Sequence, residues 1–272
     1  MPINVVISGA TGRMGQTLVG LITQDRAFQL LGGIDRDRRV GGEAARYGYR
    51  IIETAETAGE LLQNAHVLLD FSAVAGLQNL LTLRSADLAG KGLVVGTTGL
   101  TPDVLRLLAH ASITGAVIVS ANFSVGVNLV LGLVDAAARV LGPERYDVEI
   151  MEAHHKHKVD APSGTALALG YAVANGRGVA LETLRRDGRS GHTGARATGE
   201  VGFHALRGGD IVGEHRVHFI GMRERVEIAH AAQDRAIFAE GALVAASWVN
   251  GKPAGSYSMK EVLGLAFLEP GI

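Results

Sequence analysis

Residues 3–15 read INVVISGATGRMG. The apolar run Ile3–Ser8 predicts a buried strand, and apolar residues from Gly12 onward recur at helical spacing. Gly9, Gly12 and Gly15 occupy the turn between them, where glycine permits a tight bend, close approach of a phosphate group, and close packing of helix on strand. The start of a helix also favours an anion. This stretch predicts a dinucleotide site, with a GxxGxxG spacing looser than the common GxGxxG pattern.

An acidic residue ends the second predicted strand, residues 28–35. Asp35 falls 20 residues after the last glycine of the turn, where a carboxylate typically binds the adenosine ribose hydroxyls. Arg36 follows it directly, and an arginine at this point favours the additional phosphate of NADP. Arg38 and Arg39 are equally well explained as a solvated run of charge. We therefore expect NADH or NADPH as cofactor.

The order of predicted elements divides the chain in two. Further apolar strands at 66–71, 92–98 and 116–122 alternate with helices, which is typical of a Rossmann-type, doubly wound parallel α/β sheet. Beyond residue 122, a long helix at 128–142 is followed by strand-like segments at 201–207, 211–220 and 225–232 without helices between them. This pattern predicts a second, α+β domain with mixed or antiparallel pairing, in which we expect residues 211–220 to present a β edge.

Composition excludes several classes of protein. The net charge of −1 gives no reason to expect nucleic acid or a membrane as partner. The chain has no cysteine, which excludes disulfides, thiolate metal sites and a cysteine nucleophile. It begins with a strand and not with a signal peptide, and no apolar run has the length of a membrane span. We therefore expect a cytoplasmic protein.

The most unusual segment is EAHHKHKVDAPSGTA, residues 152–166. Its histidines and lysines form a cationic loop that leads into a predicted helix, whose free N–H groups favour an anion. Ser163 or Thr165 would cap this helix, and Gly164 would let a ligand approach the backbone. A metal site is disfavoured, because adjacent histidines on a strand point in opposite directions and there is no HExxH motif. A merely solvated loop would leave its like charges uncompensated.

This segment resembles the signature of the dihydrodipicolinate reductases, nicotinamide-dependent enzymes of diaminopimelate and lysine biosynthesis. Every specified position of E-x-H-H-x-x-K-x-D-x-P-S-G-T-A is present. The resemblance implies reduction of a cyclic dicarboxylate imine, formed from 4-hydroxy-tetrahydrodipicolinate by loss of water. It implies that His154 and Lys158 are the proton donors, without deciding between them, and that His155, Gly164 and Thr165 bind a carboxylate. The run His192–Arg196 has no clear role, and we expect a mobile loop there.

The predicted cofactor residues lie in four turns, of which the last two are implied by the resemblance alone. They are Gly9, Ala10, Thr11, Gly12, Arg13 and Met14; Asp35 and Arg36; Gly96, Thr97 and Thr98; and Ser120, Ala121, Asn122 and Phe123. We predict a dinucleotide-binding domain of residues 1–125 and 236–272, and a substrate-binding and oligomerisation domain of residues 126–235. By resemblance, the assembly is a homotetramer.

Other functions fit the sequence less well. Semialdehyde dehydrogenases need a nucleophilic cysteine, and none of the five tyrosines is followed four residues later by lysine, as the YxxxK dehydrogenases require. A non-catalytic NADPH-binding sensor of the same fold should have lost His154, Lys158 or the SGT turn. All three are intact, so we predict an NAD(P)-dependent oxidoreductase.

Overall fold

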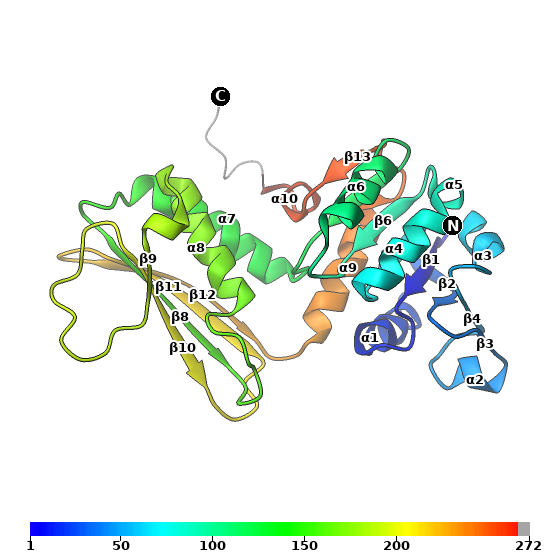
Figure 1. The fold of residues 1–272 in the computed structure, drawn as a ribbon, viewed down its shortest axis with the longest axis horizontal. Helices are drawn as coiled ribbons and strands as arrows, with labels where there is room; N and C mark the ends of the chain where they lie inside the picture. The colour runs from blue at the N-terminus through cyan, green and yellow to red at the C-terminus, as the bar shows by residue number, and fades with distance from the viewer. Residues whose placement is uncertain (266–272) are drawn as a thin grey trace. The chain divides into compact units, whose positions relative to one another are not determined.

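The chain forms two compact units in the computed structural model, which describes residues 1–265 (Figure 1). The first unit comprises Met1–Ser124 and Ala236–Val262, and the second comprises Val125–Arg235 and continues from Leu263. The end of the tail that we predict for the first domain, residues 266–272, lies outside the described residues.

The first unit is built on an eight-stranded sheet with the order β13-β7-β6-β5-β1-β2-β4-β3. All neighbouring strands run parallel except β3 and β4. The predicted doubly wound parallel sheet is thus confirmed. The strands are β1 (Ile3–Ser8), β2 (Phe28–Ile34), β3 (Arg39–Val40), β4 (Ile51–Glu53), β5 (Val67–Asp70), β6 (Gly92–Val95), β7 (Ala116–Val119) and β13 (Gly255–Tyr257).

Helices cover both faces of this sheet, as Figure 1 shows. Helices α4 and α6 contact each other over one face, and α1 and α9 contact each other over the other. Apolar side chains of α4 and α6 form a buried cluster with the central strands, which fixes the layers. The helices are α1 (Arg13–Ile22), α2 (Gly42–Ala45), α3 (Gly59–Gln63), α4 (Val74–Leu83), α5 (Ser85–Leu88), α6 (Pro102–Ala111), α9 (Ala236–Val249) and α10 (Met259–Val262).

Local sequence signals account for the start of helix α6 but not for the end of helix α4. Thr101 caps α6 by accepting a hydrogen bond from the backbone N–H of Val104, with Pro102 in the first turn. The apolar stretch 74–90 has no internal proline, yet it breaks into α4 and α5 at Arg84. The guanidinium of Arg84 donates to the carbonyl of Ala55 at 2.6 Å, which ties the break to a neighbouring loop.

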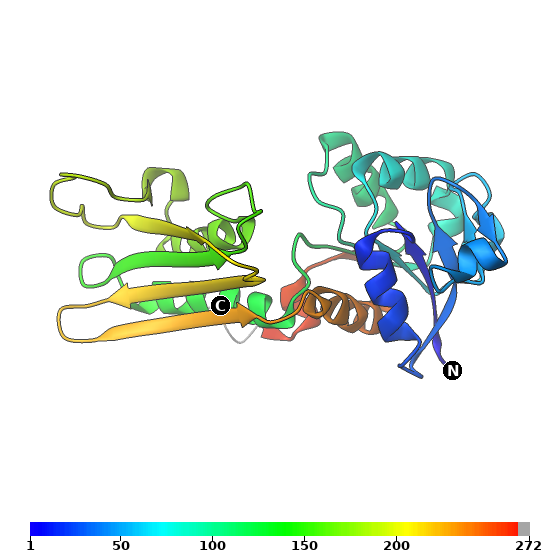
Figure 2. The same cartoon turned by 90° about the horizontal axis from the view of Figure 1, so that it is seen from below.

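The second unit contains a five-stranded sheet with the order β12-β11-β8-β10-β9, and its pairing is mixed, one of the two arrangements that we predicted. Strand β8 runs parallel to β10 and antiparallel to β11. Figure 2 shows helices α7 and α8 together behind these strands, and their apolar residues form one core with them. The elements are α7 (Val125–Val140), β8 (Asp147–His154), α8 (Gly164–Arg177), a 3-10 turn at Leu181–Thr183, β9 (Arg185–Asp187), β10 (Val201–Arg207), β11 (Gly213–Ile220) and β12 (Arg225–Ala232).

The expectation that residues 211–220 present a β edge is wrong. Strand β11 lies between β8 and β12, because it pairs with β12 as an antiparallel hairpin and with β8 on its other side. The edges of this sheet are β12 and β9. No helix within residues 1–265 combines the length and the apolar character needed to cross a bilayer.

Candidate active site

A cavity of about 710 Å³ lies where β1, β2 and β5 end. Five of the predicted cofactor residues line it, namely Gly9, Thr11, Gly12, Asp35 and Arg36. Strand order changes direction between β1 and β5, and the crevice at such a switch point is where doubly wound sheets bind ligands. The cavity therefore has the position expected of a dinucleotide site.

Two glycines of the first turn are required by its geometry. Gly9 has a φ of +80°, and a Cβ there would lie 2.5 Å from the carbonyl oxygen of Phe71. A Cβ on Gly15 would lie 2.5 Å from the carbonyl oxygen of Gly9. Gly12 caps helix α1 without a side-chain hydrogen bond, so the N–H groups of the first helical turn receive no side-chain cap. This turn has the shape that a phosphate group needs.

Asp35 is held at the cavity by the glycine turn. Its Oδ2 accepts hydrogen bonds from the backbone N–H and the hydroxyl of Thr11, at 2.8 and 2.7 Å, and its Oδ1 accepts from the N–H of Arg36 at 2.8 Å. Burial raises the pKa of Asp35, but the hydrogen bonds and the nearby Arg39 outweigh it, so the pKa lies below its ordinary value. An ionised carboxylate has further lone pairs with which to accept ribose hydroxyls.

The three arginines after Asp35 have different surroundings. Arg36 lines the cavity. Arg38 forms an ion pair with Glu53 at 2.9 Å, and Arg39 pairs with Asp37 at 3.4 Å. Arg38 and Arg39 thus have structural partners, and Arg36 is the arginine placed to meet a ligand.

The later predicted turns meet around two residues that we did not predict, Asp70 and Phe71. The hydroxyl of Thr97 donates to the buried carboxylate of Asp70 at 2.5 Å. The ring of Phe71 lies against Gly96 and meets Phe123 edge-on, with centroids 5.7 Å apart. Phe71 also lines the cavity, which links it to these turns.

Several predicted cofactor residues do not line this cavity. Ala10 is fully buried, with its methyl group against Gly33. Arg13, Thr98 and Ala121 are exposed, and Met14 is half-buried. Ser120 and Asn122 hydrogen-bond each other at the end of β7, with the Ser120 hydroxyl donating to the Asn122 carbonyl at 2.7 Å.

In the second unit, the signature segment joins the end of β8 to the start of α8. Ser163 is the N-cap of α8, and its hydroxyl oxygen accepts a hydrogen bond from the N–H of Ala166 at 3.1 Å. Of the two predicted caps, Ser163 and Thr165, the structure thus assigns the role to Ser163. A Cβ added at Gly164 would meet no atom within 4 Å, so the space beside this helix start is open.

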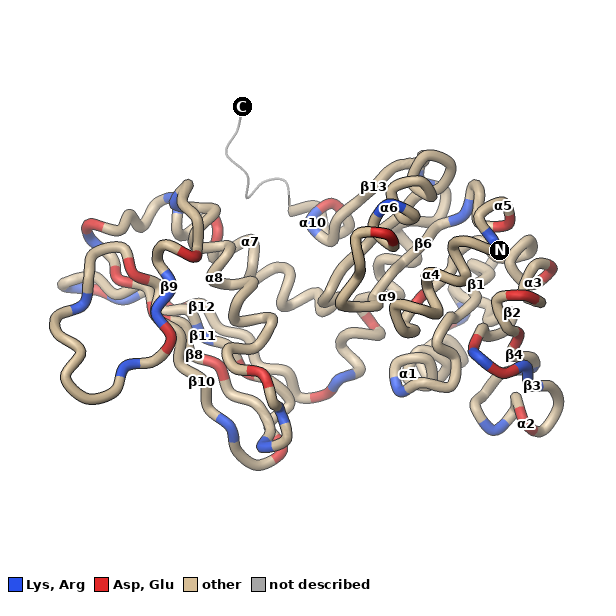
Figure 3. Tube along the Cα trace, in the orientation of Figure 1, with Lys and Arg blue, Asp and Glu red and all other residues tan. Residues whose placement is uncertain are grey.

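His154 belongs to a buried polar network. Its Nδ1 lies 2.7 Å from Oε2 of Glu152, which is 3% exposed. Arg207 reaches both carboxylate oxygens of Glu152 at 2.7 Å, and the N–H of Ser163 donates to Oε1 at 3.0 Å. Figure 3 shows acidic and basic positions close together along β8 and β10. His215 of β11 packs against the ring of His154, with centroids 5.1 Å apart.

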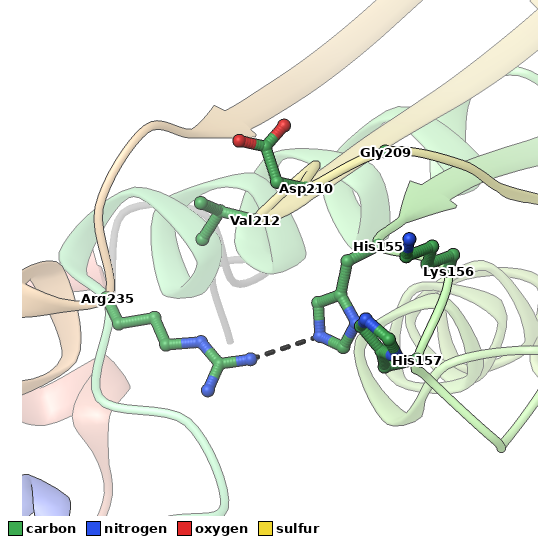
Figure 4. A pocket seen from close by; sticks show the side chains of 7 residues that line it. All are labelled: His155, Lys156, His157, Gly209, Asp210, Val212 and Arg235. Carbon is green, nitrogen blue, oxygen red and sulfur yellow. Dashed lines mark hydrogen bonds between the residues drawn. The ribbon is translucent and has the colours of Figure 1, made fainter.

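His155 and His157 border a second cavity, of about 590 Å³ (Figure 4). Arg235 donates a hydrogen bond to Nε2 of His155 at 3.1 Å, and Lys156 and Asp210 also line the cavity. Burial, Arg235 and the neighbouring cations lower the pKa of His155. Lys156 and Arg235 outnumber Asp210 in the lining, so the cavity carries net positive charge and suits an anion. Lys158, also in this loop, pairs with Asp160 at 2.8 Å.

The run His192–Arg196, expected to be mobile, is anchored at its end. Arg196 donates hydrogen bonds to Glu149 at 2.9 Å and to Asp147 at 2.7 Å, both on β8. A structural role explains this arginine. Among residues 1–265, no three His, Cys, Asp or Glu side chains gather as a metal site would require.

Known proteins resemble the chain over almost its whole length. The family model for the N-terminus of dihydrodipicolinate reductase matches residues 3–123, and the model for its C-terminus matches residues 126–263. The chain belongs to the dihydrodipicolinate reductase family. Among its relatives are the 4-hydroxy-tetrahydrodipicolinate reductases of Methylocella silvestris, 45% identical over 266 residues, and Pseudomonas fluorescens, 46% identical over 268 residues. They cover 96% of this chain, and the matches span 97% and 98% of the two relatives.

A solved structure of the family shares the fold. The dipicolinate-bound dihydrodipicolinate reductase from Paenisporosarcina sp. TG-14 has a TM-score of 0.74 to this chain, with 23% identity. The alignment covers 95% of this chain and 98% of that one.

Four polar residues of this family member's site escaped prediction: Glu152, Arg207, His215 and Arg235. Glu152 stands in the signature but received no role. Strand register brings Arg207 and His215 to the site. Arg207 of β10 is the register partner of His154 on β8, and His215 of β11 is the register partner of Glu152 on β8. Only the strand register could have revealed them.

Proposed function

We propose that this chain catalyses the NADPH- or NADH-dependent reduction of the cyclic imine derived from 4-hydroxy-tetrahydrodipicolinate. The product is tetrahydrodipicolinate, water is released, and the step belongs to diaminopimelate and lysine biosynthesis. The observation that carries the proposal is that one segment, residues 152–166, joins a carboxylate-paired histidine, a cationic cavity and an open helix start. Family membership supports the same activity.

The first unit fits a nicotinamide dinucleotide. A Cβ on Gly9 would fill the turn after β1, and helix α1 begins there without a side-chain cap. We assign pyrophosphate binding to this turn, the ribose hydroxyls to Asp35, and the additional phosphate of NADPH to Arg36. The turns after β6 and β7, with Gly96 to Thr98 and Ser120 to Phe123, complete the site. When bound, the nicotinamide supplies a hydride.

Two features of the second unit suit a dicarboxylate. Arg235 and His155 form a hydrogen-bonded pair at the second cavity, and the side chains of both can donate hydrogen bonds to an anion. Gly164 and Thr165 offer backbone N–H groups at the start of α8, where the helix dipole favours negative charge. Two such anion sites near one loop match the two carboxylates of the substrate.

His154 is the better suited of the two proton donors. The carboxylate of Glu152 lies 2.7 Å from Nδ1 and orients the ring, which leaves Nε2 to exchange a proton with the substrate. Lys158 is already paired with Asp160. We therefore assign proton delivery to His154 and charge stabilisation near the substrate to Lys158.

Assembly and location complete the proposal. The face of the five-stranded sheet away from α7 and α8 carries Met151 and Leu206, 49% and 56% exposed. Burial of such a face favours association, and we propose a homotetramer formed through the second unit, acting in the cytoplasm.

The assigned roles are tested by replacing His154 and Lys158. We expect His154→Ala and Lys158→Ala each to lower kcat by about 100-fold or more, since general acid catalysis and electrostatic stabilisation of developing charge each typically contribute about 10²-fold or more. The Kd for NADPH, measured by isothermal titration, should change less than about twofold, because these residues belong to the substrate segment. Loss of cofactor affinity in parallel with the rate would assign them to the cofactor site instead.

A further inference from the structure

Glu152 has no acceptor capacity left over in the structure. An ionised carboxylate offers about four lone-pair positions. Oε2 is bonded to Nδ1 of His154 and to Arg207, and Oε1 to the N–H of Ser163 and to Arg207, at 2.7 to 3.0 Å. Burial raises the pKa of Glu152, but hydrogen bonds from Arg207, His154 and Ser163 lower it by more than burial raises it. The pKa therefore lies below its ordinary value, and the group stays ionised.

We propose that Glu152 is a positioning residue that fixes one tautomer of His154 and ties its ring to the helix start that receives a substrate carboxylate. An ionised carboxylate only accepts hydrogen bonds, so Nδ1 of His154 must carry a proton. The other nitrogen, Nε2, is then the one that can gain or lose a proton. A Cβ on Gly213 would lie 3.0 Å from this nitrogen, so the glycine leaves room beside it.

The same carboxylate sets the position of the helix start. Its Oε1 holds the backbone N–H of Ser163, the N-cap of α8. The next two residues, Gly164 and Thr165, are the proposed carboxylate ligands. One side chain thus links proton donor and carboxylate site through two hydrogen bonds. Arg207 balances the charge of Glu152. Its guanidinium also donates to the carbonyl of Asp160 at 2.7 Å, which ties the loop between β8 and α8 to the same arginine.

His215 keeps a second charge away from His154. Its Nε2 lies 3.0 Å from the hydroxyl of Ser163. Because that hydroxyl oxygen already accepts from Ala166, its proton is available for His215. Burial lowers the pKa of His215 to about 4, so this ring is neutral near pH 7. Glu152 and His215 contact the His154 ring directly, Arg207 reaches it through Glu152, and His155 follows it in the chain.

The inference rests on the proposed proton-donor role of His154, and Glu152→Gln tests it. We expect kcat to fall about 10- to 100-fold, as is typical when a group that orients a functional histidine is lost. The KM for NADPH should stay unchanged. Glu152→Asp, which keeps the charge, should restore most of the lost kcat.

Glu149→Gln is the matched control. Glu149 lies on the same strand, accepts from Arg189 and Arg196, and has Oε2 2.7 Å from His204, but its pair lies outside the proposed site. It should keep the wild-type kcat. If Glu152→Gln does not fold because Arg207 is left uncompensated, the double variant Glu152→Gln with Arg207→Gln carries the test.

Nitrogen-15 NMR of the substrate-free protein separates this inference from the proposed function. We expect His154 to show a protonated Nδ1 in the neutral ring of the wild type, and to lose this preference in Glu152→Gln but not in Glu149→Gln. An unchanged His154 tautomer in Glu152→Gln would overturn the inference. Absence of turnover in the wild type would overturn the proposed function, while the NMR comparison would still decide the role of Glu152.

Discussion

His215 is a buried histidine whose protonation is coupled to folding. Its side chain is 5% exposed, and burial lowers its pKa from 6.5 to about 4. The unfolded chain therefore binds a proton at a higher pH than the folded chain does. The stability that depends on the neutral ring is fully present above pH 6.5 and is lost as the pH falls toward 4.

This residue predicts a measurable pH dependence. Between pH 7 and pH 4, the free energy of unfolding should fall by on the order of 3 kcal/mol through His215 alone, since one pKa unit corresponds to about 1.4 kcal/mol. Urea denaturation at both pH values would measure the change. His215→Gln should show a correspondingly smaller drop, and an equal drop in variant and wild type would refute the assignment.

Among the elements, helix α1 offers two glycines with opposite expected responses to alanine. A Cβ on Gly15 would lie 2.5 Å from the carbonyl of Gly9, whereas a Cβ on the exposed Gly20 would meet nothing within 4 Å. Gly15→Ala should lower the free energy of unfolding by about 1–3 kcal/mol through overpacking, and should weaken NADPH binding. Gly20→Ala should raise stability by up to about 1 kcal/mol, because alanine is the better helix former.

Thermal or urea unfolding with NADPH titration of both variants would check this pair. Equal effects of the two substitutions would show that the glycine turn does not depend on the contact between helix and strand. A normal NADPH affinity in Gly15→Ala would argue against the proposed pyrophosphate turn.

How far the sequence predicts these elements depends on their length and burial. Strands such as β1, β5 and β6 are continuous apolar runs, and α6 has its own cap signal, so local patterns suffice. Strands β3, β9 and β13 have two or three residues each, too few for any periodicity, and exist through pairing with a neighbour. The break between α4 and α5 depends on a contact of Arg84 with a distant loop.

The same distinction applies to the candidate site. The glycine turn and residues 152–166 are each one continuous segment of sequence, so the sequence alone indicates their chemistry. Arg207 and His215 come from other strands, and sheet register places them beside Glu152 and His154. Asp70 and Phe71 end an ordinary apolar strand, and only the meeting of several turns gives them a role.

At the scale of the whole molecule, the proposed tetramer predicts that substitutions on the exposed sheet face of the second unit disrupt assembly. Met151→Glu would place a charge on the open sheet face, which should dissociate the assembly because burying an unpaired charge is costly. Ile113 is 69% exposed in the first unit, so Ile113→Glu serves as the control and should leave assembly intact. Light scattering at micromolar concentration measures both, and a stable wild-type monomer would contradict the proposal.

The central claim is that the chain reduces the cyclic imine derived from 4-hydroxy-tetrahydrodipicolinate with a nicotinamide cofactor. The most direct measurement mixes the purified protein with freshly generated substrate and follows the oxidation of NADPH, and separately of NADH, by absorbance. We predict saturable turnover with formation of tetrahydrodipicolinate, and its near abolition by His154→Ala. Tight binding of NADPH without any turnover would contradict the claim and would indicate a non-catalytic cofactor-binding protein of the same fold.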